Sequence, residues 1–465
     1  MMTEEDIKSS GHFQMLRCFK HYPKEYVMQK NSFPRDAVKP AAFSSTGAAV
    51  TLGAARVHAA ENNTLKVGLL GCGSRGCGAA INTLEADSNV ELYAVGDAFR
   101  ANAIAGLEGL TEQFGNRINV TPDRIFEGLD SFKEVIPLCD VVLLCEPPVF
   151  HVRSLRYAVE AGKHVFCEKP ACSDVPGIKN VLESTEIAKR NGTTLVSGLC
   201  WRYHPDVAEM VNRVKDGEIG DVVSGRLLYV TGQLWKRPRQ DGDTEMKFQV
   251  RNWYNFSWLN GDFVVSQHVH TLDKALWVMN DVVPDYFFSL GGRMQRIEQP
   301  NNGDVYDAFA SCLEYKSGVT FYSYCRQQNG CWSKNDAIIA GTKGTAELLT
   351  GVIRDYSGNV VYQQKKSPQD MYLIEHQKMY EAIRSGNPIN NGEYMAKATM
   401  MGIASRIACY TGTRVSWDDA MAIEDSMAPS GYTWDDSPWT LPDEKGRYLI
   451  PVPGEGRVYH QIVRN

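Results

Sequence analysis

The chain has 465 residues, more than a single hydrophobic core usually holds, so at least two domains are expected. Its apolar fraction of 43% and charged fraction of 22% are ordinary for a soluble globular protein. The net charge of −6 and the lack of a dense basic patch argue against a nucleic-acid partner. No apolar run approaches the roughly 20 residues of a membrane helix, so no membrane span is expected.

The twelve cysteines are scattered and form no C-x-x-C pair, which excludes an obvious disulfide framework or zinc site. Several lie in or beside apolar runs, where a free thiol acts as a small core residue. These are Cys139, Cys145, Cys167 and Cys200. We therefore expect free thiols.

Residues 1–60 are expected to form a leader. A basic start at Arg35, a short weakly apolar stretch at 41–52 and the small residues before Ala60 are typical of a cleaved export signal. The pattern is similar to a twin-arginine signal, although Pro34 stands where the first arginine is expected. The prediction is therefore an extracytoplasmic, periplasmic protein. The alternative is a disordered leader on a cytoplasmic enzyme.

Residues 61–200 alternate between short apolar runs and helical stretches. Strands are expected at 66–70, 90–96, 140–145, 164–167 and 194–198, with helices at 79–84, 103–114, 152–161 and 175–190. This alternation predicts a parallel, doubly wound sheet of the Rossmann type, with ligands at the carboxyl ends of its strands.

A glycine-rich turn follows the first strand. In Gly71-Cys72-Gly73-Ser74-Arg75-Gly76, the first glycine permits a tight turn and the second lets backbone amides approach a pyrophosphate. The third lets helix and strand pack closely, and the helix N-terminus favours phosphate. The alternative is a tight turn in an α/β protein that binds nothing.

Asp97 ends the second strand, about twenty residues after the last glycine of the turn. Its carboxylate would accept hydrogen bonds from a ribose diol and repel a 2′-phosphate. The sequence therefore predicts NAD in preference to NADP, although Arg100 lies close enough to pair with a phosphate.

The pattern changes after about residue 200. Long β-branched and aromatic runs at 222–230, 304–315 and 319–326 predict an open, largely antiparallel sheet. Helices are expected at 267–280, 371–385 and 393–411. Residues 201–425 are thus predicted to form a second α/β domain for substrate binding and oligomerisation, with residues 426–465 as a tail packed on the domains.

Two polar clusters indicate chemistry. Lys169, in Glu168-Lys169-Pro170 at a strand end, could relay a proton or stabilise an alkoxide, whereas an isolated lysine there would more often form a surface salt bridge. His270 and Asp273 share a helix face, so Asp273 could orient the imidazole. His268 adds a second histidine, but no third ligand follows at useful spacing, and no metal is expected.

Together these motifs resemble the Gfo/Idh/MocA family, the glucose–fructose oxidoreductase and inositol dehydrogenase group, over about residues 64–420. The resemblance is carried by the glycine-rich turn, by residues 161–170, by Trp201-Arg202-Tyr203-His204-Pro205, by the motif from His270 to Asp273, and by residues 341–345. It implies an N-terminal Rossmann domain, a C-terminal α/β domain with an open sheet, and a homo-oligomer, dimer or tetramer, built through that sheet.

The resemblance also implies residue roles. Lys169 matches the catalytic lysine, His270 the acid/base histidine, and Asp273 completes the catalytic set. Arg202 matches a residue near nicotinamide and substrate, and His151 one that lines the cofactor channel. The expected cofactor-binding set is Gly71, Gly73, Ser74, Arg75, Gly76, Asp97, Arg100, Glu146, His151, Glu168, Lys169 and Arg202. The expected substrate-binding set is Lys169, Arg202, Tyr203, Trp253, His268 and His270, with Tyr254 and Trp258 as further stacking candidates.

Two positions depart from the family pattern. Ser266 stands where many members have a carboxylate, four residues before the histidine, so a proton relay would run through Gln267, His268 or water. Glu146-Pro147-Pro148 replaces a Thr-Pro-Asn-like turn. Glu146 is a hydrogen-bond acceptor candidate near the nicotinamide ribose.

Three functions follow from the resemblance. The leading one is NAD-dependent hydride transfer at a hydroxyl or keto carbon of a sugar, glycoside or cyclitol. The second is an NAD-dependent glycosidase, in which transient oxidation permits elimination, hydration and re-reduction with a retained cofactor. The third is a nucleotide-binding sensor without catalysis, against which the presence of both Lys169 and His270 argues.

Overall fold

The first sheet is built from six parallel strands in the order β3-β2-β1-β4-β5-β6. The computed structural model describes residues 63–455. The six strands are β1 Leu65–Leu70, β2 Val90–Asp97, β3 Ile125–Glu127, β4 Val141–Leu144, β5 His164–Cys167 and β6 Leu195–Ser197. β4 is buried along its whole length, as its continuous apolar run requires in a sheet covered on both faces. The predicted doubly wound Rossmann sheet is confirmed.

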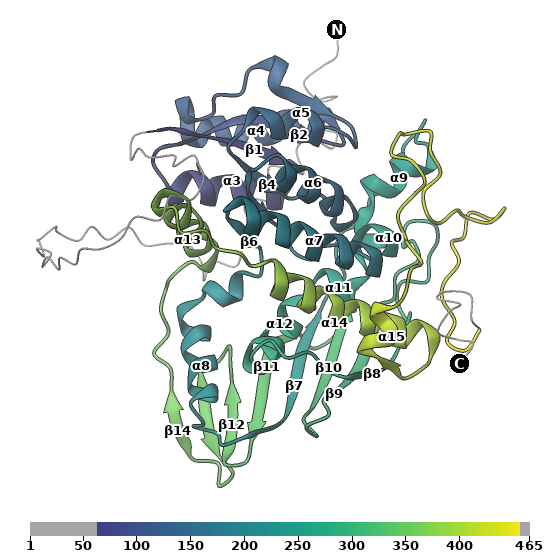
Figure 1. Cartoon of the computed structure of the whole chain (residues 1–465). Helices are drawn as coiled ribbons and strands as arrows, with labels where there is room; N and C mark the ends of the chain where they lie inside the picture. The colour runs from purple at the N-terminus through teal and green to yellow at the C-terminus, as the bar shows by residue number, and fades with distance from the viewer. Residues whose placement is uncertain (1–62, 456–465) are drawn as a thin grey trace, which may run out of the picture. The chain divides into compact units, whose positions relative to one another are not determined.

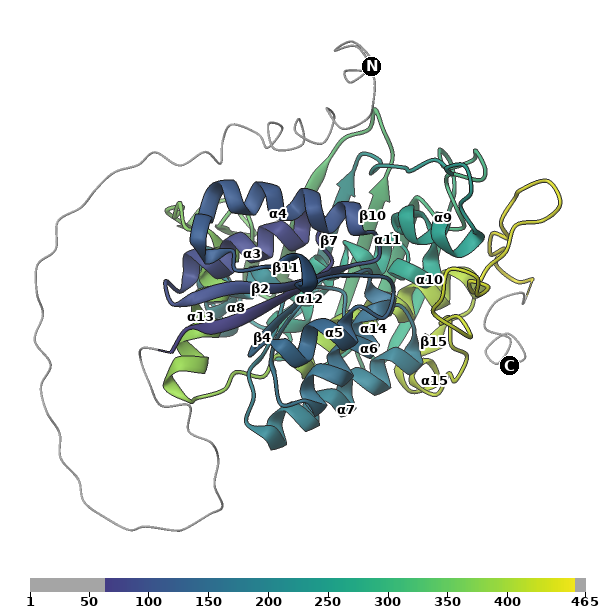
Figure 2. The ribbon, with the colours of Figure 1, turned by 90° about the horizontal axis from the view of Figure 1, so that it is seen from above.

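Helices cover both faces of this sheet (Figure 2). α3 (Ser74–Ala86) and α4 (Arg100–Phe114) lie on one face, and α5 (Phe132–Val135), α6 (Pro148–Glu160) and α7 (Val175–Asn191) on the other. α13 (Met371–Ser385) joins the α3 side, where its Met379 and Tyr380 pack in one cluster with Ala79 and Ala80. A late helix thus completes the nucleotide-binding half.

The second sheet has nine strands in the order β14-β13-β12-β11-β7-β10-β9-β8-β15. β7 and β10 pair in parallel and the other neighbours are antiparallel, so the predicted open, mostly antiparallel sheet is confirmed. The strands are β7 Val222–Thr231, β8 Tyr286–Gly292, β9 Ala308–Glu314, β10 Thr320–Gln327, β11 Lys334–Gly341, β12 Gly344–Glu347, β13 Val352–Asp355, β14 Val360–Gln363 and β15 Val415–Ser416.

Helices pack on one face of the nine-stranded sheet and connect it to the parallel sheet (Figure 1). α14 (Gly392–Thr411) packs against both α7 and β8, so a single core cluster contains Cys167 of β5 and Phe321 of β10. The remaining helices are α8 Pro205–Lys215, α9 Glu245–Arg251, α10 Ser257–Asn260, α11 Phe263–Ser266, α12 Val269–Val278 and α15 Trp417–Met421, with 3₁₀ turns that include η6 Cys200–Tyr203 and η7 Trp253–Asn255.

Most expected elements occur within a few residues of their predicted bounds, and α13 matches its predicted range. β3, β8, β15 and the strands from β11 to β14 had no sequence prediction. β12, β13 and β14 have four residues each, which is too few for a clear alternating pattern. The division at about residue 200 stays a prediction. The expected leader lies outside the described residues. Within residues 63–455, none of the helices combines the length and apolar character needed to cross a membrane.

Candidate active site

The glycine-rich turn joins β1 to α3 and leaves the start of α3 open. Gly71 has φ of +86°, and a Cβ on Gly76 would lie 1.8 Å from the Gly71 oxygen, so both positions need glycine. A Cβ on Gly73 would meet nothing within 4 Å. Gly73 caps α3 without a side-chain hydrogen bond, so the first amides of the helix remain available to a phosphate. The turn therefore fits the pyrophosphate of a dinucleotide.

Asp97 is held beside this turn by three hydrogen bonds. Its carboxylate accepts from the backbone N–H of Cys72 (2.7 Å) and Phe99 (2.9 Å) and from Nδ2 of Asn102 (3.1 Å). Burial raises the pKa of Asp97, and these hydrogen bonds oppose the rise. An ionised carboxylate has about four acceptor positions, so one is left for a ribose hydroxyl. The guanidinium of Arg100 donates instead to the carbonyl oxygen of Ile125 (2.7 Å).

Two polar groups, at the carboxyl end of β4 and the start of α6, have buried atoms with unused hydrogen-bonding capacity. Glu146 accepts from Ser154 (3.1 Å) through one oxygen, while its other oxygen has no partner within residues 63–455. Nδ1 of His151 lies 3.0 Å from the Pro170 oxygen and must carry the proton there, which leaves Nε2 unpartnered in the described part of the chain. Burial raises the pKa of Glu146 to about 7 and lowers that of His151 to about 4. Both suit hydrogen bonding to a bound cofactor.

Glu168 links the glycine-rich turn to the strand end that bears Lys169. Nε of Arg75, in the first turn of α3, donates to one carboxylate oxygen, and the N–H of Lys169 donates to the other (3.0 Å). Burial alone would raise the pKa of Glu168, but Arg75 and Lys169 hold it below its usual value. Both oxygens of Glu168 are thus engaged within the chain. We therefore interpret Glu168 as a support of the site, whereas Nη2 of Arg75 has no hydrogen-bond partner within residues 63–455 and is available to a cofactor.

The structure brings Lys169 and His270 together. Nζ of Lys169 donates to the carbonyl oxygen of Ser266 (2.9 Å) at the end of α11, and His270 follows in the first turn of α12. Burial lowers the pKa of His270 well below its usual value, and the nearby ammonium groups of Lys169 and Lys274 lower it further. Burial also lowers the pKa of Lys169, although Glu168 opposes this. A neutral imidazole beside an ammonium can handle the proton and the charge on one oxygen.

Asp273 is hydrogen-bonded to Arg202 instead of to the imidazole that it was expected to orient. Its carboxylate accepts two hydrogen bonds from Nε of Arg202 (2.9 and 3.1 Å), and Arg202 also pairs with Asp281 (2.7 Å) and lies 3.9 Å from the ring centroid of Tyr394. Among the described residues, no hydrogen bond joins Asp273 to His270. The helix spacing correctly placed His270 and Asp273 on α12. The guanidinium of Arg202, in η6, nevertheless takes the hydrogen bonds of the Asp273 carboxylate.

Of the three residues noted before His270, His268 and Gln267 bond to strand β10, and Ser266 bonds to Lys169. Nε2 of His268 lies 2.6 Å from Oγ of Ser323 on β10, and Oε1 of Gln267 accepts from Gln327 (3.1 Å). Burial lowers the pKa of His268 to about 3. Ser266 contributes its backbone oxygen to Lys169, a role that its side-chain chemistry did not indicate.

Only some of the aromatic residues that were expected to stack on a substrate have side chains that could do so. Trp253 stacks on Tyr254 with centroids 4.1 Å apart, and Trp235 packs edge-on against both. Trp258 is fully buried and donates to Gln249 (2.6 Å), so it belongs to the core and cannot stack on a substrate. The hydroxyl of Tyr203 donates to Asn391 (2.7 Å).

α13 supplies residues to the site that sequence reasoning missed. The Arg75 guanidinium lies 4.7 Å from the ring centroid of Tyr372, and Glu375 is fully buried with neither carboxylate oxygen hydrogen-bonded within residues 63–455. Burial raises the pKa of Glu375 well above its usual value. The helical periodicity of α13 indicated a helix, but it contained no signal for the element against which the helix packs.

Two family models match the chain. An oxidoreductase family with an NAD-binding Rossmann fold (Gfo/Idh/MocA) matches residues 65–198, and the Gfo/Idh/MocA C-terminal domain matches residues 207–347. Together these ranges cover more than half of the 465 residues.

Individual relatives agree with this. The myo-inositol 2-dehydrogenase of Thermotoga maritima is 24% identical over 353 residues, which cover 74% of this chain and 95% of the relative. The aldose–aldose oxidoreductase of Caulobacter crescentus, solved with glycerol, has a TM-score of 0.60 at 21% identity and covers 76% of this chain and all of its own. A levoglucosan dehydrogenase solved with NADH and levoglucosan has a TM-score of 0.59 at 18% identity, with 76% and 99% covered.

Proposed function

Because the chain belongs to the Gfo/Idh/MocA family of NAD-binding oxidoreductases, we propose that it transfers a hydride at a CH–OH or keto carbon of a sugar, glycoside or cyclitol. The substrate class rests on the inositol, aldose and levoglucosan enzymes that resemble it. Bound NAD would supply or accept the hydride.

One observation supports this proposal more than any other. The Lys169 ammonium, fixed on the Ser266 oxygen, lies within electrostatic reach of a His270 imidazole whose Nδ1 has no partner within the described residues. The same β5 end bears Glu168, which is bound to the glycine-rich turn through Arg75. The acid/base pair and the dinucleotide turn are therefore physically connected.

We assign separate roles to the two groups. His270 has a depressed pKa and is neutral near pH 7, so it takes the hydroxyl proton during oxidation and returns it during reduction. Lys169 is the cation that stabilises negative charge on the same oxygen. Trp253 and Tyr254 offer apolar ring faces to the carbohydrate.

The test is a screen of purified protein with NAD. Free sugars, cyclitols and nitrophenyl glycosides would be offered, and absorbance at 340 nm would be recorded together with nitrophenol release and product analysis. Net NADH formation that is lost in Lys169→Ala and His270→Ala is the expected result. Nitrophenol release without net NADH would favour the glycosidase, and NAD binding without turnover of any compound would favour the sensor.

We further propose that two or more copies associate through the outer face of the nine-stranded sheet. Alternation along β8 and β10 buries one set of side chains and leaves Phe288, Leu290, Tyr322 and Tyr324 exposed. An aromatic and aliphatic sheet face of this kind favours a protein partner, and a second copy has the same face. Light scattering should report a dimer or tetramer for the wild type. The double variant Leu290→Lys/Tyr322→Lys should be a monomer. A wild-type monomer at micromolar concentration would contradict this proposal.

A further inference from the structure

The C-terminal segment, residues 426–448, reaches the carboxyl edge of the parallel sheet. The ring of Trp434 stacks on Phe99 with centroids 5.4 Å apart and planes at 22°. Phe99 lies two residues after Asp97, and its N–H donates to the Asp97 carboxylate (2.9 Å). One residue of the segment therefore packs on the residue that positions the expected ribose acceptor.

The segment is attached to the Rossmann half at two further places. Tyr432 packs edge-on against Phe150 in the first turn of α6, and the Arg153 guanidinium lies 3.7 Å from the Tyr432 ring centroid. Asp174, the N-cap of α7, accepts from the N–H of Met427 (2.7 Å) and from Ser426 (3.0 Å). The contacts thus follow the loops after β2, β4 and β5, at the carboxyl edge where a dinucleotide binds in a doubly wound sheet.

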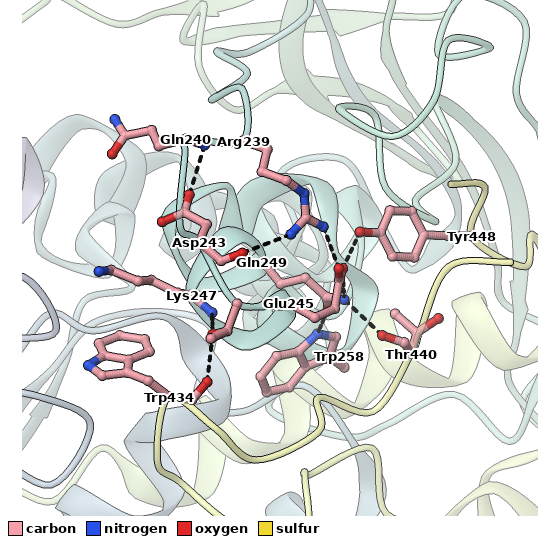
Figure 3. A network of polar contacts seen from close by, with 11 residues as sticks. Arg239, Gln240, Asp243, Glu245, Lys247, Gln249, Trp258, Trp434, Thr440 and Tyr448 are labelled. Carbon is pink, nitrogen blue, oxygen red and sulfur yellow. Dashed lines mark hydrogen bonds and ion pairs between the residues drawn. The ribbon is translucent and has the colours of Figure 1, made fainter. Parts of the chain in front are cut away.

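Polar contacts hold the other side of the segment on α9 (Figure 3). Oγ1 of Thr244 donates to the Trp434 oxygen (2.5 Å), Gln249 donates to the Thr440 oxygen (2.8 Å), and the Tyr448 hydroxyl bonds Glu245. The Arg251 guanidinium, paired with Asp243, lies 4.5 Å from the ring centroid of Phe99. Phe99 is thus contacted both by the segment and by α9.

We propose that residues 426–448 form a wall of the adenosine half of the NAD site, with Trp434 as a positioning residue. Trp434 fixes Phe99, and the Phe99 N–H fixes the Asp97 carboxylate in the orientation that a ribose diol needs. The wall also slows departure of the dinucleotide. The segment lies outside both family-matched ranges. The inference depends on the NAD site and holds whichever reaction the enzyme performs.

The first test compares Trp434 with an exposed tryptophan outside the segment. Trp434→Ala should weaken binding of NAD and of ADP-ribose about 3- to 10-fold, mainly through faster dissociation, and leave binding of nicotinamide mononucleotide unchanged. Trp434→Phe should restore most of the affinity because it keeps the stack. Trp332→Ala is the control, since Trp332 is 67% exposed and lies outside residues 426–448, and it should bind all three ligands like the wild type. Unchanged ADP-ribose binding in a folded Trp434→Ala protein would overturn the proposal.

The second test needs no substitution. ADP-ribose added to the wild-type protein should slow hydrogen exchange of amides in residues 426–448, whereas nicotinamide mononucleotide should not. Exchange that ADP-ribose leaves unchanged there, while it slows exchange in residues 71–76, would also overturn the proposal. A wild-type protein that binds no ADP-ribose would instead count against the NAD site.

Discussion

Nζ of Lys169 donates a 2.9 Å hydrogen bond to the carbonyl oxygen of Ser266, the residue that stands where a carboxylate was expected. The contact uses the backbone oxygen and does not depend on the Ser266 side chain, which adds no charge there. The lysine is thereby aimed at the start of α12, where His270 lies. Its charge is balanced from the other direction, by Glu168.

Removal of the Lys169 or the His270 side chain should greatly slow hydride transfer. Lys169→Ala and His270→Ala should each lower kcat about 10²- to 10⁴-fold, the range of a positioned acid/base, because both act on charge that develops in the transition state. The NAD dissociation constant should change little, since the turn and Asp97 hold the cofactor. Lys378→Ala, at an exposed ion pair with Glu381, is the control and should keep wild-type kcat. Full turnover in both site variants would place the chemistry elsewhere.

The pH profile should show the depressed pKa values. In the oxidation direction His270 must be neutral, and its pKa lies well below 6.5, so kcat/KM should stay flat as pH falls through 6.5 and decline only below it. On the basic side kcat/KM should decline with a midpoint below pH 10.5, because burial lowers the pKa of Lys169 and the ammonium therefore loses its charge at a lower pH. An acid limb with its midpoint at or above 6.5 would contradict the assignment to His270.

The cofactor preference should follow Asp97. A 2′-phosphate placed near this buried carboxylate costs on the order of 1–3 kcal/mol, so NAD should bind roughly 10- to 100-fold more tightly than NADP. Asp97→Asn should reduce the difference in affinity between NAD and NADP, chiefly because NADP binds more tightly. Calorimetric titration of the apoprotein measures both constants. Equal or tighter NADP binding in the wild type would contradict this prediction, and Arg100, now bonded to the Ile125 oxygen, is the cation close enough to pair with a phosphate.

Asp273 should matter more for stability than for proton transfer. Its side chain is 1% exposed and pairs with Arg202, so Asp273→Asn should lower the free energy of unfolding by about 3 kcal/mol. The loss in kcat should stay below about tenfold, because the carboxylate is hydrogen-bonded to Arg202 and not to His270. Urea denaturation and steady-state kinetics separate the two effects. Asp281→Asn is the control, since that partner is 39% exposed and should cost at most about 1 kcal/mol.

Export should depend on residues 1–60. A fusion of these residues to a reporter that works only outside the cytoplasm should give a signal, because the weakly apolar stretch and the small residues before Ala60 suit a cleaved leader. Protein recovered from its host should begin near Ala60. A recovered protein with its complete N-terminus would contradict export.

Local chemistry in the sequence was enough to predict the nucleotide half. The run that becomes β1, the Gly71–Gly76 turn and Asp97 at the end of β2 are close in sequence, and each part has a physical reason for its residue type. The helix periods of α12, α13 and α14 were likewise sufficient to place those helices. The class of cofactor and the class of fold therefore follow from neighbouring residues.

Only the tertiary structure determined the partners of the polar side chains. Asp273 pairs with Arg202 across 71 positions, Lys169 reaches Ser266 across 97, and Trp434 stacks on Phe99 from the far end of the chain. Helix spacing shows which residues share a face, but a buried charge is directed by whichever opposite charge or acceptor the packing brings near. The packing of the two sheets and the C-terminal segment determines which distant residues lie next to each other. Local periodicity in the sequence contains no information about this packing.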